Sequence, residues 1–229
     1  SFVDLVRKNH KEQIARWLER VLDAAISEIY IADFVEEKLL SVGDITSPSQ
    51  EVIERLQEDG LEQRQAHHRF ARQKDHKRPV SNSEEGWEER ARSHLFRSKR
   101  ALSLATYLKV RRTLVEFGKK SLSADGLAKL ADTPRGADAI RKVLRKAKAD
   151  RVGICVVDIS VCGAIQPYNA ILGGKLVSML AASPEVAQEY RRRYSNAESE
   201  IASAMAGRAI RRPPNLVLAG TTSLYGVGS

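Results

Sequence analysis

The stretch "VGICVVDISV", residues 152–161, marks the change between two kinds of sequence in this chain. It is rich in β-branched residues, too apolar for a half-exposed strand and too short for a typical buried helix. It therefore predicts a central strand over 152–160 that is covered on both faces. Asp158 lies inside this run, where a buried carboxylate would be costly unless it were paired.

A second apolar run, "NLVLAGTTSL" at 215–224, predicts another strand, and the residues between the two runs predict helices. One helix should follow Gly174, and another should begin at Ser183, since Pro184 and Glu185 suit a first helical turn. This order favours two parallel strands joined by a crossover. Two strands do not make a stable layer, so we expect an incomplete sheet, with further strands upstream or beyond the last residue.

The sequence before residue 150 is predicted to be helical. Apolar residues recur at three- and four-residue steps at Ile14, Leu18, Val21, Leu22, Ala25 and Ile29. Further helices are expected over 31–40, after a cap at Ser47, over 87–118, and over 134–149 with Thr133 as its cap. The polar residues 59–87 suggest a loop or a solvated helix, followed by a turn.

The predicted fold class is therefore α/β, with a mainly helical N-terminal part and a C-terminal sheet-containing domain built on a strand-helix-helix-strand unit. The predicted domains are a helical module over 1–60, a polar linker over 61–86, and a domain over 87–229. The last contains basic helices over 87–149 and an α/β unit over 151–229.

The composition is that of a folded protein, with 42% hydrophobic and 29% charged residues among 229. No apolar run approaches the roughly 20 residues of a membrane span, and no leader opens the chain, so we expect a cytoplasmic protein. Cys155 and Cys162 would face opposite sides of a strand, which argues against a disulfide. The three histidines at 67, 68 and 76 lack the cysteine or carboxylate spacing of a metal site.

The charge is unevenly distributed along the chain. Residues 1–50 hold 6 Lys and Arg against 9 Asp and Glu, giving −3, whereas residues 101–150 hold 12 against 5, giving +7. A basic region favours an anionic partner, usually nucleic acid and here DNA, although a basic face also serves simple solvation and the helix dipole. The candidate nucleic-acid contacts are Arg97, Arg100, Arg111, Arg112, Arg141, Lys142, Arg145, Lys146, Lys148, Arg191, Arg192 and Arg193.

The turn "PYNAILGGKL", residues 167–176, is a candidate phosphate cradle. A turn at the carboxyl end of a strand aims the free N–H groups of the next helix at an anion, and two glycines would clear the approach. The motif is neither a Walker motif nor a dinucleotide fingerprint. In the alternative interpretation, Ile171, Leu172 and Leu176 pack and the glycines only allow a tight turn. The candidate ligand contacts are Tyr168, Asn169, Gly173, Gly174, Lys175, Thr221 and Ser223.

These patterns leave two functions open, a nucleic-acid-binding module and an enzyme that binds a phosphate-bearing ligand. Asp158 or residues 221–223 would lie near any chemistry, but Ser223 has no motif-defined histidine partner. No catalytic residue or cofactor is assigned.

Two long stretches carry a family resemblance, "ICVVDISVCGAIQPYNAILGGKLVSMLAASPEVAQEYRRRY" at 154–194 and "LVLAGTTSLYGVGS" at 216–229. They resemble the Druantia protein A family of bacterial anti-phage defence. A weaker likeness in "HLFRSKRALSLATYL", 94–108, extends the resemblance to about 87–229. It implies a bacterial cytoplasmic protein that works with phage or plasmid nucleic acid and other defence proteins, in a family whose chains run beyond this C-terminus.

Two further expectations stand beside that resemblance. Strand, glycine turn and helix form a remote architectural analogy to acyltransferases of the GNAT type, although this sequence departs from their Arg-Gly-x-Gly core. The apolar stripe within residues 4–41, outside the family resemblance, predicts docking on another chain or on a second copy, and hence a homo-oligomer.

Overall fold

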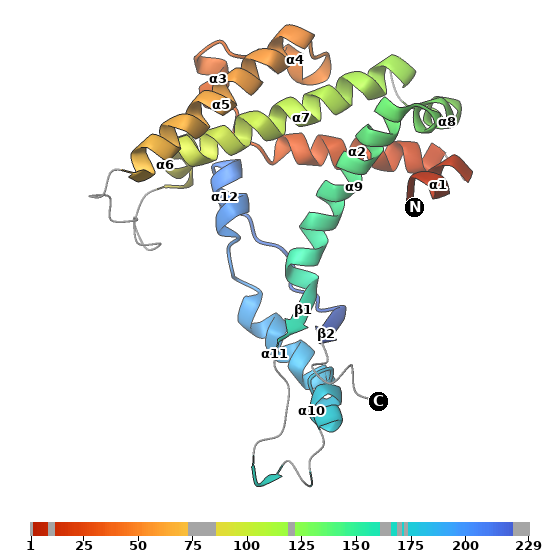
Figure 1. The fold of residues 1–229 in the computed structure, drawn as a ribbon, viewed down its shortest axis with the longest axis vertical. Helices are drawn as coiled ribbons and strands as arrows, with labels where there is room; N and C mark the ends of the chain where they lie inside the picture. The colour runs from red at the N-terminus through yellow and green to blue at the C-terminus, as the bar shows by residue number, and fades with distance from the viewer. Residues whose placement is uncertain are drawn as a thin grey trace. The chain divides into compact units, whose positions relative to one another are not determined.

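The structure is a computed structural model that describes residues 2–8, 12–72, 86–118, 122–160, 166–168, 171 and 174–221. It is mostly helical, with a small sheet of two parallel strands (Figure 1). The elements are α1 (Phe2–Lys8), α2 (Glu12–Ser27), α3 (Ala32–Glu36), α4 (Val42–Thr46), α5 (Gln50–Arg72), α6 (Trp87–Arg92), α7 (His94–Gly118), α8 (Ala124–Asp132), α9 (Pro134–Cys155), β1 (Val156–Ile159), α10 (Gly174–Leu180), α11 (Pro184–Tyr194), α12 (Glu200–Ala206) and β2 (Leu218–Thr221).

The chain divides into two compact units. Residues 1–147 and 200–210 form one, which we call the helical unit, and residues 148–199 and 211–229 form the other, the sheet unit. These units are defined by compactness alone. The division of the sequence at residues 60 and 86 therefore stays a prediction.

The helical unit is built on two long helices, α5 and α7, that run side by side (Figure 1). Ser98 Oγ donates a hydrogen bond to the Gly60 carbonyl at 2.7 Å, and Arg112 Nη1 donates to Gln50 Oε1 at 2.8 Å, so the two helices are antiparallel. Gly60 permits this close approach, because a Cβ there would lie 2.7 Å from Leu102 Cγ. Helices α2 and α8 pack on α7 and close the core from the other side.

The apolar stripe of α2 is buried inside its own chain. Leu18, Leu22 and Ile29 belong to the same core as Leu104 and Leu108 of α7. The stripe was predicted correctly, but the expectation that residues 4–41 dock on another chain loses its basis, because the apolar face is already covered.

A buried ion pair joins α3 to α7. The Arg100 guanidinium donates to both carboxylate oxygens of Asp33, at 2.9 and 2.6 Å, and both side chains are almost wholly excluded from solvent. The same guanidinium donates to the carbonyl oxygens of Tyr30 and Ala91. These bonds tie three segments of the unit to one side chain.

Several helix boundaries differ from the sequence-based expectation. The helix expected over 31–40 is only the short α3, and a further short helix, α4, follows it before Ser47. Ser49, and not Ser47, caps α5, since its Oγ accepts the Val52 N–H at 3.2 Å. The helix expected over 87–118 is interrupted at Ser93, and the polar stretch after residue 59 continues α5 as a solvated helix.

The prediction of a strand over 152–160 was wrong at its start and in its surroundings. Helix α9 continues to Cys155, because no residue stops it after 149, and β1 has only four residues. Asp158 is exposed, so the strand is not covered on both faces. The parallel pairing was predicted correctly, and β1 and β2 align from Val156 opposite Leu218 to Ile159 opposite Thr221.

The described part of the sheet unit has almost no buried core. Pro214 is its one buried residue, and every residue of the hydrophobic core cluster belongs to the helical unit. Large apolar side chains stay exposed instead, with Met179 at 63% and Val217 at 75%. None of the described helices has the length and apolar character to cross a membrane.

Candidate nucleic-acid interface

Helix α9 carries the strongest candidate surface. Its start is fixed by Thr133, whose Oγ1 accepts the Gly136 N–H at 3.0 Å, as the sequence predicted. Ile140 and Val143 are buried in the core of the helical unit, and Leu144 packs against it. The opposite side of the helix is left to polar residues, which here are mostly basic.

The five basic residues of α9 between positions 141 and 148 fall into two groups. Lys142 Nζ lies 2.8 Å from Asp138 Oδ2, and Lys146 Nζ lies 2.8 Å from Glu28 Oε2. The hydrogen bond from Lys142 lowers the pKa of the Asp138 carboxyl. These two lysines are therefore engaged within the fold.

The second group consists of Arg141, Arg145 and Lys148. All three are exposed, and they form no ion pair within the described part of the chain. Steps of four and three residues place them on one side of the helix. They are free to contact an anionic partner.

The arginines of α7 mostly hold the helical unit together. Arg97 donates to both carboxylate oxygens of Glu37, each at 2.6 Å, and to Asp59 Oδ1 at 2.8 Å. Arg111 pairs with Asp23. Hydrogen bonding to Arg97 lowers the pKa of Glu37.

Two other α7 arginines are also engaged. Arg112 donates to Gln50 and lies near Glu116, while Arg100 is fully buried on Asp33. A fully buried guanidinium cannot reach a phosphate, so Arg100 is left out of the interface proposed below.

The three consecutive arginines of α11 also divide into residues with and without an ion pair in the described structure, as the basic residues of α9 do. Glu189 accepts hydrogen bonds from Arg192 at 2.7 and 2.6 Å, which lower the pKa of the Glu189 carboxyl. The charge of Arg193 contributes to the same lowering. Arg191 and Arg193 are exposed and form no ion pair with a described residue.

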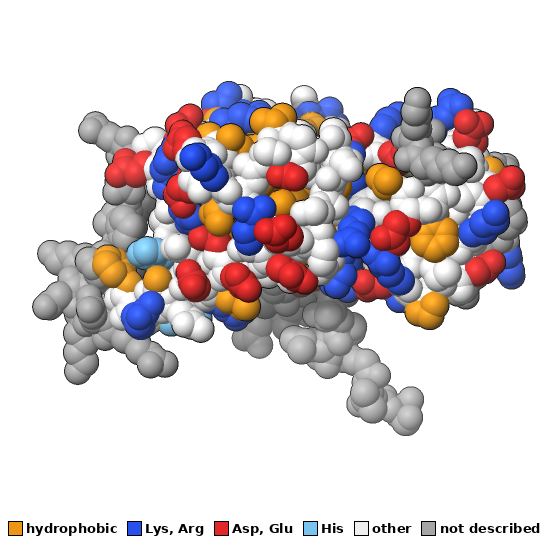
Figure 2. Space-filling view, turned by 90° about the horizontal axis from the view of Figure 1, so that it is seen from above, with side chains coloured by type: hydrophobic (Ala, Val, Ile, Leu, Met, Phe, Trp, Pro, Cys, Tyr) orange, Lys and Arg blue, Asp and Glu red, His pale blue; other side chains and the backbone are white. Residues whose placement is uncertain are grey.

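The acidic partners of these basic residues were missed by the sequence analysis. Asp23, Glu28, Asp33, Glu37 and Asp59 all lie within the first 59 residues of the chain. The opposite net charges of the acidic start and the basic middle of the chain were a signal in the sequence for such pairing. Figure 2 shows the result on one face of the helical unit, where basic and acidic side chains are interspersed.

The Gly-Gly turn is described only in part. Helix α10 begins at Gly174, as predicted, and the aligned ends of β1 and β2 lie at one edge of the sheet. Tyr168 is 59% exposed and Ile171 is 85% exposed, so Ile171 does not pack as the alternative interpretation required. Asn169, Gly173 and Ser223 lie outside the described residues, as do the side chains of Lys175 and Thr221.

The described residues contain no group of three or more His, Cys, Asp and Glu side chains arranged to hold a metal ion. His94 Nδ1 lies 2.6 Å from Gln63 Oε1, which gives this histidine a polar partner on α5. Cys155 is a free thiol at the end of α9, and Cys162 lies outside the described residues.

A protein family matches the C-terminal part of the chain in sequence. The match begins within α8, includes β2 and runs to the last residue. Residues 126–229 match the family Druantia protein DruA. The match confirms the Druantia resemblance for these residues and suggests a component of Druantia anti-phage defence. It includes α9 and α11, whereas residues 87–125 lie outside it. No curated protein and no solved structure matches the chain.

Proposed function

We propose that the protein is a Druantia anti-phage defence component that binds nucleic acid through the outer side of α9. One observation carries the proposal: Arg141 and Arg145 are exposed without an ion pair in the described structure, while their neighbours Lys142 and Lys146 are paired. Among the described residues the two lysines contribute ion pairs to the fold, whereas the two arginines contribute none. Lys148 is the next exposed basic residue on the same side of the helix.

The spacing of these residues suits a phosphate backbone. From Arg141 to Lys148 the helix rises by about 10 Å, at 1.5 Å per residue. Phosphates of one DNA strand recur at about 3.4 Å along the duplex axis while they wind around it, so three long, flexible side chains spread over this rise can reach up to three of them. Duplex DNA is therefore the partner that we expect at α9.

The test is duplex binding as a function of salt concentration. The triple variant R141Q/R145Q/K148Q should bind a duplex more weakly, and the slope of log K against log salt should fall by up to about 2.7, or roughly 0.9 per lost contact. The melting temperature should change little, because none of the three charges is paired within the described fold.

The matched control is R20Q/R64Q/R69Q, which removes three exposed charges of the helical unit that lack an ion pair in its described part. It changes the net charge by the same amount. Equal losses in both triple variants would mean that total charge, and not α9, determines binding. An unchanged salt slope in the α9 variant would overturn the proposal.

A second candidate function is binding of a phosphate-bearing ligand at residues 168–175. It is favoured by the start of α10 at Gly174 and by the parallel register that brings the ends of β1 and β2 together. Binding of ATP or an acyl-CoA to the full chain, lost in Gly174→Val with the helical content unchanged, would support it. Unaltered binding in this variant would count against it.

A further inference from the structure

The C-terminal end of α11 presents a surface that the α9 proposal does not use. The rings of Tyr190 and Tyr194 pack together with their centroids 4.7 Å apart. Tyr190 is half-buried, and its hydroxyl donates to the Ile154 carbonyl at 3.1 Å. Tyr190 is therefore held against the end of α9, and it supports the Tyr194 ring from one side.

Tyr194 is the more accessible ring of this pair. Its side of the helix is open, with 38% of the residue exposed. An aromatic ring that is supported by a fixed neighbour and open to solvent can stack on a flat partner. Packing within the described residues does not explain why this ring stays exposed.

Two arginines that form no ion pair with a described residue lie on either side of this tyrosine face. Positions 191 and 193 are about 60° and 100° around the helix from position 194, in opposite directions, whereas position 192 is nearly opposite. The Arg193 guanidinium lies 6.0 Å from the Tyr194 ring centroid. The ion pair with Glu189 neutralises the charge of Arg192, and this pair lies on the side of the helix away from the tyrosines.

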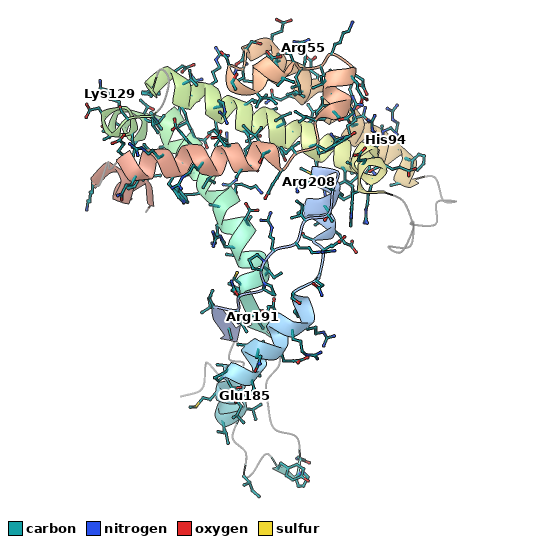
Figure 3. The ribbon with its side chains drawn as sticks, turned by 180° about the vertical axis from the view of Figure 1, so that it is seen from behind. Arg55, His94, Lys129, Glu185, Arg191 and Arg208 are labelled. Atoms are coloured by element: carbon teal, nitrogen blue, oxygen red, sulfur yellow. The ribbon has the colours of Figure 1, made fainter. Side chains whose placement is uncertain are left out.

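No described acidic side chain of the sheet unit forms an ion pair with these two arginines, although the charge of Arg193 contributes to the lowered pKa of Glu189. Asp150 pairs with Arg212, and Glu198 pairs with Arg211. Glu185 stands at the beginning of α11, roughly 9 Å along the helix from Arg191 at 1.5 Å per residue. Figure 3 labels both residues toward opposite ends of the helix. The positive charge is thus concentrated where the ring is exposed.

We propose that this surface binds single-stranded nucleic acid, with a base stacked on Tyr194 and flanking phosphates on Arg191 and Arg193. The inference rests on the proposed nucleic-acid function and adds a second kind of substrate to it. In a duplex, the faces of the bases are covered by neighbouring bases, so an exposed ring finds no base face to stack on. In a single strand the faces are free, and an aromatic ring flanked by cations suits them.

The helix dipole alone does not account for this arrangement. Basic residues in a last helical turn favour the helix, and this applies to all three arginines equally. It gives no reason for an exposed tyrosine between two of them. The combination of ring and charges is what distinguishes a stacking surface from a solvated helix end.

The experiment compares Tyr194 variants of the full chain on two probes, a labelled twelve-nucleotide thymidine strand and a twelve-base-pair duplex. Tyr194→Ala should weaken binding of the single strand by about 5- to 150-fold, the range expected for one stacked base, and leave duplex binding nearly unchanged. Tyr194→Phe keeps the ring and should bind as the parent does. Tyr194→Leu keeps apolar bulk without a π face and should behave like Tyr194→Ala.

The arginines are tested by salt dependence. Arg191→Gln with Arg193→Gln should lower the salt slope for the single strand by about 1.4, or roughly 0.7 per phosphate contact. Arg192→Gln is the matched control on the opposite side of the helix and should change it little. Thermal melting of each variant confirms that the fold is retained.

The outcomes separate this inference from the α9 proposal. If the parent binds the duplex through α9 but Tyr194→Ala leaves single-strand binding intact, only the inference at α11 fails. It also fails if Tyr194→Phe is as weak as Tyr194→Ala, or if both probes lose affinity equally. If the α9 triple variant keeps its full duplex affinity while Tyr194→Ala loses the single strand, only the α9 proposal fails.

Discussion

The two units of this protein use their apolar residues in opposite ways. The helical unit buries leucines from α2, α7 and α8 in one continuous core, whereas the described part of the sheet unit leaves Met179, Leu180, Val217 and Leu218 exposed. Val217 and Leu218 are neighbours in the chain and point to opposite sides, so both sides of β2 at this point are open. Stability therefore resides mainly in the helical unit.

The same contrast holds for charge. In the helical unit, Arg97, Arg100 and Arg111 form ion pairs with acidic residues that are distant in the sequence. On α11 the one ion pair between described residues, that of Glu189 with Arg192, is local to the helix, and neither Arg191 nor Arg193 forms an ion pair with a described residue. A basic residue is thus informative about function only after its partners are known.

The largest expected effect tests the buried charge of the helical unit. Asp33→Ala leaves the Arg100 guanidinium buried without its carboxylate and should lower the free energy of unfolding by about 3–5 kcal/mol. Asp138→Ala, which removes an exposed pair within one helix, should cost only about 0.3–0.5 kcal/mol. Urea denaturation measures both. Similar losses would show that the Asp33 pair is not isolated from water.

The next comparison uses apolar truncations, one in each unit. Leu104→Ala opens a cavity in the core of the helical unit and should cost about 2–5 kcal/mol. Met179→Ala removes an exposed side chain of the sheet unit and should stay within about 0.5 kcal/mol. A loss of more than 2 kcal/mol for Met179→Ala would mean that the sheet unit has a core that the described residues do not reveal.

Local signals were predictable from the sequence, and long-range pairing was not. The caps at Thr133 and Ser183 and the start of α10 at Gly174 were predicted correctly, because each depends on a few adjacent residues. The parallel strands followed from the order of the elements. The pairing of Arg100 with Asp33 spans 67 residues, and no local pattern specifies such a contact.

The start of β1 was mispredicted for a related reason. "VGIC" has β-branched residues typical of a strand, but it continues a helix that is already formed, and adding one more turn to a helix is cheaper than starting a strand. The exposed apolar residues of the sheet unit were equally unpredictable. A sequence of strand type implies a buried strand only when other elements cover it.

A matched pair of glycines gives a smaller effect, with opposite signs in the two units. Gly60→Ala should destabilise the protein by roughly 1–3 kcal/mol, because the new Cβ would lie 2.7 Å from Leu102 Cγ in the contact between α5 and α7. Gly153 lies near the end of α9 with no atom within 4 Å of an added Cβ. Gly153→Ala should therefore stabilise the helix by about 0.5–1 kcal/mol. Thermal melting should move in opposite directions; a shift of the same sign would contradict the packing contrast.

The smallest effect is the acid dependence of one ion pair from each unit. Hydrogen bonds from arginine lower the folded-state pKa of both Glu37 and Glu189 below the ordinary value of 4.5. A lowered carboxyl pKa stabilises the fold above the unfolded-state value, and this contribution disappears as the pH falls through the folded-state value. Glu37→Gln and Glu189→Gln should each flatten the loss of stability below pH 4.5.

The two variants should differ in size and in salt dependence. Arg97 keeps only 14% of its side chain exposed, whereas Arg192 keeps 76%, so salt should screen the Glu189 pair more effectively. In urea titrations between pH 3 and 6 at low and high salt, Glu37→Gln should flatten the acid limb at both salt concentrations. Glu189→Gln should have a measurable effect only at low salt. Equal effects that vanish together at high salt would mean that the Arg97 pair is as open to water as the pair on α11, and the contrast in charge between the two units would not hold.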